Sequence, residues 1–182
     1  MTMEYGNTNR SAALQSGAGK YLTFGLGEEE YGLEILKVRE IIGLMDITKV
    51  PRTPEYIRGV INLRGKIIPV LDLRRKFAMP PVDETDESCI IVVDVSDENG
   101  TTLMGLLVDT VCEVLRIAAE NLEPAPSFGR GIDSGFIQGM AKVGERVKIL
   151  LDIEHVLSTS DVVAIHHLAE REEAAGQGPR ST

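Results

Sequence analysis

Tryptophan is absent from this chain of 182 residues, and only four Phe and four Tyr are present. The core must therefore be built mainly from Val, Ile and Leu. Cysteine is also scarce: Cys89 and Cys112 both lie in apolar runs and form no CxxC motif, which argues against a zinc or redox site. We expect two buried free thiols in a reducing compartment. No segment is long and apolar enough to span a bilayer and no apolar leader opens the chain, so we expect a cytoplasmic protein without direct membrane insertion.

The chain has no excess of positive charge, since 19 Lys and Arg stand against 28 Asp and Glu. The longest basic cluster is Arg74-Arg75-Lys76, too little to replace the counterions of a nucleic acid. Glycine-rich nucleotide loops and nucleophile elbows are missing as well. His155, His166 and His167 lack the spacing of metal ligands. These absences predict a protein that is not an enzyme, with no catalytic residue, no metal, no cofactor and no nucleic-acid partner.

What is present is mostly β-strand pattern. Two polar segments, 1–19 and 161–182, are expected to be a flexible N-terminus and a helical extension with a disordered tail. The residues between them alternate or run apolar over short stretches with Gly, Asp or Asn turns, which is typical of strands. We expect strands at 20–26, 31–35, 59–63, 66–73, 89–95 and 102–108, a hairpin within 143–153, and a helix that begins near Ile153.

An internal repeat organises these strands. Residues 56–60 (YIRGV) match 136–140 (FIQGM) at an offset of 80, and the match continues without a gap to 70–73 against 150–153. A second match at an offset of 73 pairs 31–33 with 104–106, and Glu40 with Glu113. Each copy offers about five strands, enough to close one small barrel. We therefore predict a mainly β fold of two five-stranded SH3-like barrels packed together, roughly 20–85 and 86–160, with short helices including one at the C-terminus. Whether the two lobes exchange a terminal strand stays open.

Two segments, YGLEILKVREI (31–41) and PEYIRGVINLRGKIIPVLDLRRKF (54–77), resemble the CheW family of bacterial chemotaxis coupling proteins. The likeness continues through GLLVD (105–109) and KILLDI (148–153), and covers about 20–157. The resemblance implies paired SH3-like barrels and a scaffold role without catalysis. It also implies two partners: the regulatory domain of a CheA-type histidine kinase, and the cytoplasmic tip of chemoreceptors.

Four residues are the candidate partner-binding site: Val38, Glu40, Gly59 and Arg64. The resemblance places the segment with Val38 and Glu40 at the contact region, although Val38 could equally fill the core and Glu40 be a solvated charge. Arg64 lies at an expected hairpin tip, where a guanidinium can bind a carboxylate through two hydrogen bonds. The other repeat has Gly144 there, so the fold does not require arginine. A competing hypothesis pairs Arg64 with a carboxylate of its own chain, such as Glu40.

Gly59 has a repeat counterpart in Gly139, which favours a backbone requirement at both positions. Asp72 and Asp152 also repeat, and an end-of-strand turn or cap explains them better than acid–base catalysis does. The alternative function, a sensor that binds a small ligand in the cleft between the barrels, would need a pocket with converging polar groups. The sequence shows no such cluster.

Overall fold

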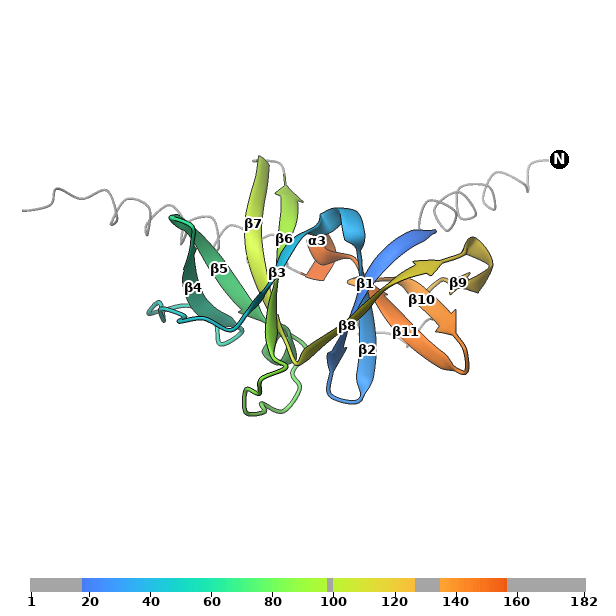
Figure 1. Ribbon diagram of the computed structural model, residues 1–182, viewed down its shortest axis with the longest axis horizontal. Helices are drawn as coiled ribbons and strands as arrows, with labels where there is room; N and C mark the ends of the chain where they lie inside the picture. The colour runs from blue at the N-terminus through green and yellow to red at the C-terminus, as the bar shows by residue number, and fades with distance from the viewer. Residues whose placement is uncertain (1–17, 98–99, 127–134, 157–182) are drawn as a thin grey trace, which may run out of the picture. The chain divides into compact units, whose positions relative to one another are not determined.

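The computed structural model describes residues 18–97, 100–126 and 135–156, and its chain is mainly β. These residues form two compact units. Unit 1 contains 18–36 and the described part of 111–156, and unit 2 contains the described part of 37–110. Each unit holds one sheet, as expected for two small barrels. Figure 1 shows the two sheets with their strand labels.

Unit 2 is built on a five-stranded sheet in the order β3-β6-β7-β5-β4. Antiparallel pairs join β3 to β6, β6 to β7 and β4 to β5, whereas β5 and β7 run parallel. The apolar runs read from the sequence face its core, which includes Ile61, Ile68, Val70 and Ile90. The strands are β3 (Val38–Gly43), β4 (Ile57–Leu63), β5 (Lys66–Asp72), β6 (Cys89–Asp97) and β7 (Gly100–Val108).

Unit 1 has the same strand order with one addition, β8-β1-β2-β11-β10-β9. The sixth strand, β9, has only two residues, and its counterpart in unit 2 is the single bridge between Thr48 and Val60. The core of unit 1 includes Tyr21, Ile117, Ala141 and Leu150. The strands are β1 (Gly19–Leu26), β2 (Glu29–Glu34), β8 (Thr110–Ile117), β9 (Leu122–Glu123), β10 (Ile137–Val143) and β11 (Arg146–Leu151).

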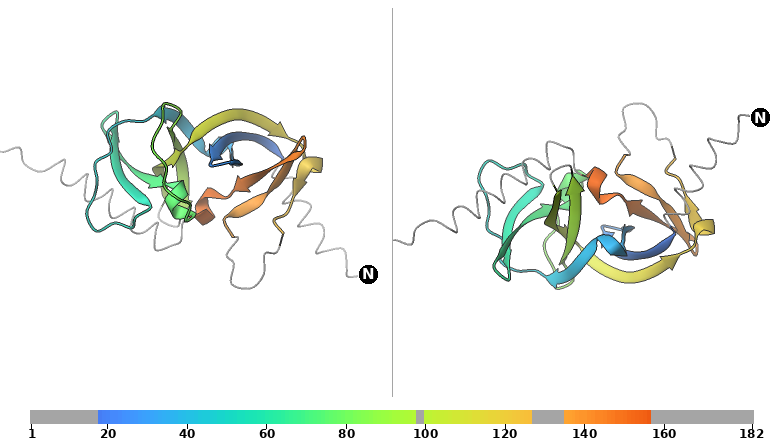
Figure 2. Two further views of the ribbon diagram at one scale, coloured as in Figure 1. Left: turned by 90° about the horizontal axis from the view of Figure 1, so that it is seen from below. Right: turned by 90° about the horizontal axis from the view of Figure 1, so that it is seen from above.

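The two units are not successive halves of the chain, so a division at 85/86 is wrong for the units, although it separates the two repeats. The hairpin β1–β2 joins the sheet of the second repeat, and the hairpin β6–β7 joins that of the first. Figure 2 shows this exchange in colour: the blue hairpin lies in the same sheet as the orange strands, and the yellow-green hairpin with the green ones. The two repeats therefore exchange a whole hairpin each, rather than one terminal strand.

The repeat itself appears in the register. Val70 pairs with Gly105 in unit 2, and Leu150 pairs with Gly32 in unit 1, at the two offsets read from the sequence. In both units a bulge precedes the glycine of the outer hairpin, before Gly59 in β4 and before Gly139 in β10.

A proline within a strand pattern favours an edge position or a bulge. Pro69 nevertheless lies in an interior strand, because β5 has β4 on one side and β7 on the other. Proline is tolerated here for a local reason. Its partner on β4, Val60, directs both its N–H and its C=O to Thr48, at 2.9 and 2.8 Å. The pairing with β7 begins one residue later, at Val70. No neighbouring strand therefore needs a donor at position 69.

Helices are short in the described residues. They are the 3₁₀ turns η1 (Ile35–Lys37) and η2 (Ala119–Asn121) and the helices α2 (Leu73–Lys76) and α3 (Ile153–Val156). The helix expected at Ile153 begins there, and the helical extension expected at 161–182 lies outside the described residues. The expectation of two buried thiols is wrong: Cys89 is half-buried and Cys112, on the edge strand β8, is exposed.

Candidate functional site

Glu40 and Arg64 are brought together in unit 2 although 24 residues separate them. Nη1 of Arg64 donates to Oε1 of Glu40 and Nη2 donates to Oε2, both at 2.7 Å. Glu40 lies on β3 and Arg64 follows β4, the two strands at opposite ends of the sheet order. The ion pair therefore connects the two edge strands of unit 2. It is also open to solvent, since the side chain of Arg64 is 74% exposed and that of Glu40 29%.

The turn that carries Arg64 has an unusual backbone for arginine. Arg64 has φ of 53° and Gly65 of 84°, two positive values as in the two-residue hairpin turns that match strand twist. Oδ1 of Asn62 accepts a hydrogen bond from the backbone N–H of Gly65 at 2.9 Å and supports the turn. In unit 1 the equivalent residue is Gly144, with φ of 63°. Glycine adopts this conformation without strain, so arginine at position 64 is unfavourable for the local backbone.

Glu40 and Arg64 each stabilise the charged form of the other. Hydrogen bonds from Arg64, and then its positive charge, hold the pKa of Glu40 below its ordinary value, and the same contact raises the pKa of Arg64. Both groups are therefore charged throughout the physiological range. Burial alternates along β3, which places Val38 and Glu40 on its more covered face and leaves Ile41 exposed at 44%. Ile41 therefore lies on the face of β3 opposite to Val38 and Glu40.

Gly59, the fourth predicted site residue, is buried, with a positive φ and close contacts. Its φ is +142°, and a Cβ there would lie 2.1 Å from the carbonyl oxygen of Thr48. Gly139 has only the second constraint, because its Cβ would lie 3.0 Å from the carbonyl oxygen of Glu123. The backbone requirement inferred from the repeat is therefore present, and at Gly59 it is twofold. The geometry gives Gly59 a structural role beneath the 47–55 segment.

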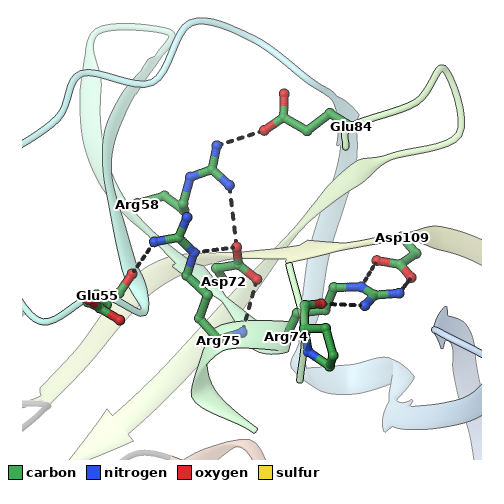
Figure 3. Close-up of polar contacts among 8 residues, drawn as sticks. Glu55, Arg58, Asp72, Arg74, Arg75, Glu84 and Asp109 are labelled. Atoms are coloured by element: carbon green, nitrogen blue, oxygen red, sulfur yellow. Dashed lines mark hydrogen bonds and ion pairs between the residues drawn. The ribbon is translucent and has the colours of Figure 1, made fainter. Parts of the chain in front are cut away.

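A second polar group, which the sequence did not reveal, surrounds Asp72 (Figure 3). Arg58 donates to Asp72 at 3.3 Å and to Glu84 at 2.8 Å, and the backbone N–H of Arg75 donates to Oδ1 of Asp72 at 3.3 Å. Asp72 thus caps α2, the role expected from its place at the end of a strand. Asp152 does the same in unit 1, accepting from the N–H of Glu154 at 3.1 Å. The two carboxylates lie in different units, each as the cap of its own short helix.

Arg74 and Asp109 form a second two-pronged ion pair in Figure 3, at 2.7 and 2.6 Å, and both side chains are largely covered. Arg74 also donates to the carbonyl oxygen of Pro80 at 2.8 Å. This network fastens α2 and the 78–84 segment to the end of β7. Sequence separation explains why it was missed: Arg74 and Asp109 are 35 residues apart and belong to no shared motif.

An open cavity of about 510 Å³ lies on unit 2, lined mainly by 47–58 and Arg75. It contains none of the predicted site residues Val38, Glu40, Gly59 and Arg64. Within the described part of the chain no three His, Cys, Asp or Glu side chains gather as metal ligands. The described residues also include no helix that is long and apolar enough to cross a membrane.

Comparison with known proteins gives a consistent result. The family model described as CheW-like domain matches residues 20–161. The chemotaxis protein CheW of Klebsiella aerogenes is 40% identical over 151 residues, which are 83% of this chain and 89% of that protein. A probable chemotaxis protein CheW of Rhizobium etli is 33% identical over 149 residues, 82% of this chain and 94% of that protein.

The fold has a solved counterpart as well. The crystal structure of the scaffolding protein TtCheW from Thermoanaerobacter tengcongensis matches with a TM-score of 0.69 and 38% identity, over 79% of this chain and 95% of that chain. Sequence and fold thus agree, and the chain belongs to the CheW-like domain family.

Proposed function

We propose that this protein is a non-catalytic chemotaxis adaptor in the cytoplasm, which couples chemoreceptors to a CheA-type histidine kinase. Its relatives are named chemotaxis proteins, and the solved counterpart is described as a scaffolding protein. A rigid β unit suits this role because its edge strands and turns present fixed surfaces to partners. The regulatory domain of the kinase and the cytoplasmic tip of the receptor are the two partners.

The surface formed by Val38, Glu40 and Arg64, here called the β3 edge surface, is the proposed contact with one of these partners. The observation that carries this assignment is the arginine itself. Arg64 occupies a left-handed turn position that glycine fills in unit 1, and 74% of its side chain is exposed. An arginine whose backbone conformation is unfavourable and whose side chain is open to solvent points to binding rather than to folding.

The ion pair creates an ambiguity that an experiment can resolve. Arg64 could act on a partner directly, or it could act only by holding Glu40 and the β3 edge in place. The charge-exchanged variant Glu40→Arg/Arg64→Glu keeps an ion pair at the same place but inverts both charges. If a partner contacts these charges directly, it should bind the variant weakly. If the ion pair only holds the β3 edge in place, partner binding should be unchanged.

The test measures binding of the kinase regulatory domain and of receptor fragments by calorimetry, with thermal unfolding as the control. The proposal expects binding of one partner to weaken at least tenfold in the Arg64→Ala and charge-exchanged variants, while the melting temperature stays near that of the wild type. Arg64→Gly serves as a matched variant because unit 1 has glycine in this turn. Full binding by the charge-exchanged variant would show that the pair is only structural, and absence of binding by the wild type would overturn the adaptor function.

A further inference from the structure

The two exchanged hairpins are equivalent in backbone and meet equivalent strands. The hairpin β1–β2 runs alongside β11 through the parallel pair Gly32 and Leu150. The hairpin β6–β7 runs alongside β5 through the parallel pair Gly105 and Val70. Because these pairs repeat at the same positions, backbone hydrogen bonding alone would accept either hairpin on either strand. Side chains must therefore decide which hairpin joins which unit.

One pair of positions differs sharply between the units. Two residues before each parallel pair, β2 carries Glu30 and β11 carries Lys148, which form an ion pair in unit 1. Lys148 is nearly enclosed, with 6% of its side chain exposed. The equivalent positions in unit 2 are Leu103 and Ile68, where Ile68 is buried in the core and Leu103 packs against that core. An enclosed charge pair in one unit thus replaces an apolar pair in the other.

Unexchanged hairpins would mismatch at both places. Glu30 would then lie beside Ile68 in one unit, and Leu103 would lie beside Lys148 in the other. Each mismatch would leave a covered charge without its partner, which costs far more than a matched pair gains. We propose that the ion pair between Glu30 and Lys148 specifies the exchange of the two hairpins by excluding the sequential arrangement.

Stability alone does not account for the pair. An apolar pair in the same place is often at least as stable as an enclosed ion pair, and unit 2 shows that this position of the fold accepts one. The best-attested role of such a pair is to fix one arrangement among several that are otherwise close in energy. Two homologous hairpins within one chain present that choice.

The test moves the charges between the repeats in the full chain. The hairpin variant Glu30→Leu/Leu103→Glu and the strand variant Lys148→Ile/Ile68→Lys each mismatch the observed arrangement at both positions and match the unexchanged one. The quadruple variant carries all four substitutions, and it restores the match with the ion pair now in unit 2. It therefore serves as the control for damage caused by the substitutions themselves.

Two measurements read the outcome: the urea midpoint of unfolding, and the NMR contacts that place Gly32 beside either Leu150 or Val70. We expect each double variant to lose about 1–2 M in midpoint or to place Gly32 beside Val70. We expect the quadruple variant to regain most of the loss, with Gly32 beside Leu150. Wild-type behaviour of both double variants, or a quadruple variant as damaged as the two doubles added together, would overturn the proposal.

Discussion

Replacing Gly59 with alanine tests how the fold fixes the 47–55 segment over β4. A Cβ at position 59 would lie 2.1 Å from the carbonyl oxygen of Thr48 and 3.0 Å from Cγ2 of Ile47. That carbonyl oxygen accepts a hydrogen bond from the N–H of Val60 at 2.9 Å, and the N–H of Thr48 donates back at 2.8 Å. The methyl group therefore cannot enter unless Thr48 moves and both hydrogen bonds break.

The cost follows from two contributions. Two backbone hydrogen bonds contribute about 1 kcal/mol each. Holding alanine at φ of +142° adds about 1–3 kcal/mol of strain. The sum is about 3–5 kcal/mol, which for a domain of this size lowers the melting temperature by about 10 °C or more.

The matched control is Gly139→Ala in unit 1. Its Cβ would meet only the carbonyl oxygen of Glu123, at 3.0 Å, and the backbone there is outside the left-handed region. We expect a loss of about 1 kcal/mol, measured by urea unfolding of both variants and the wild type. Equal losses at the two glycines would refute the reasoning from positive φ and close approach. A stable Gly59→Ala protein that fails only in partner binding would instead favour a direct contact role for this position.

Three further outcomes are expected. Burial raises the pKa of Tyr21 to about 12, so its protonated form stabilises the fold up to pH 10, and that contribution is lost as the pH rises toward 12. The variant Tyr21→Phe should therefore lose less stability than the wild type between pH 8 and pH 11. Equal losses in the two proteins would contradict this. NMR titration should show the pKa of Glu40 below its ordinary value and returning toward it in Arg64→Ala, and an unchanged pKa would mean that the ion pair does not form in solution. A maleimide should label exposed Cys112 before half-buried Cys89 in the native protein, and the reverse order would contradict the exposure of Cys112.

The alternation of apolar and polar residues, together with the turn residues, predicted most of the strands. The hairpin around Arg64 and Gly65 was expected because two β-rich runs flank a short turn signal, and β4 and β5 pair as expected. The repeat identified the positions that correspond between units, since a buried glycine and a capping aspartate meet the same backbone need in each copy. In both cases the residue type meets a need of the backbone at its own position, which is why the pattern is visible in the sequence.

Membership of the units could not be predicted, because it depends on contacts between distant residues. Glu30 and Lys148 are 118 residues apart, and no sequence pattern near either residue predicts that they pair. The ion pair between Glu40 and Arg64 was one of two open alternatives for the same reason. The interior position of Pro69 could not be predicted either, because its tolerance depends on where Val60 directs its hydrogen bonds, which is a property of the neighbouring strand. Cys112 was expected to be buried and is exposed, because an apolar run does not show which strand of a sheet is at the edge and left uncovered.

The proposed coupling of receptor to kinase can be tested by measuring the phosphorylation rate of a CheA-type kinase mixed with receptor-containing membranes. We expect that adding this protein makes the rate depend on receptor ligand, and that the charge-exchanged variant Glu40→Arg/Arg64→Glu loses this dependence while remaining folded. A kinase whose rate is the same with and without the wild-type protein, across related receptors and kinases, would contradict the claim.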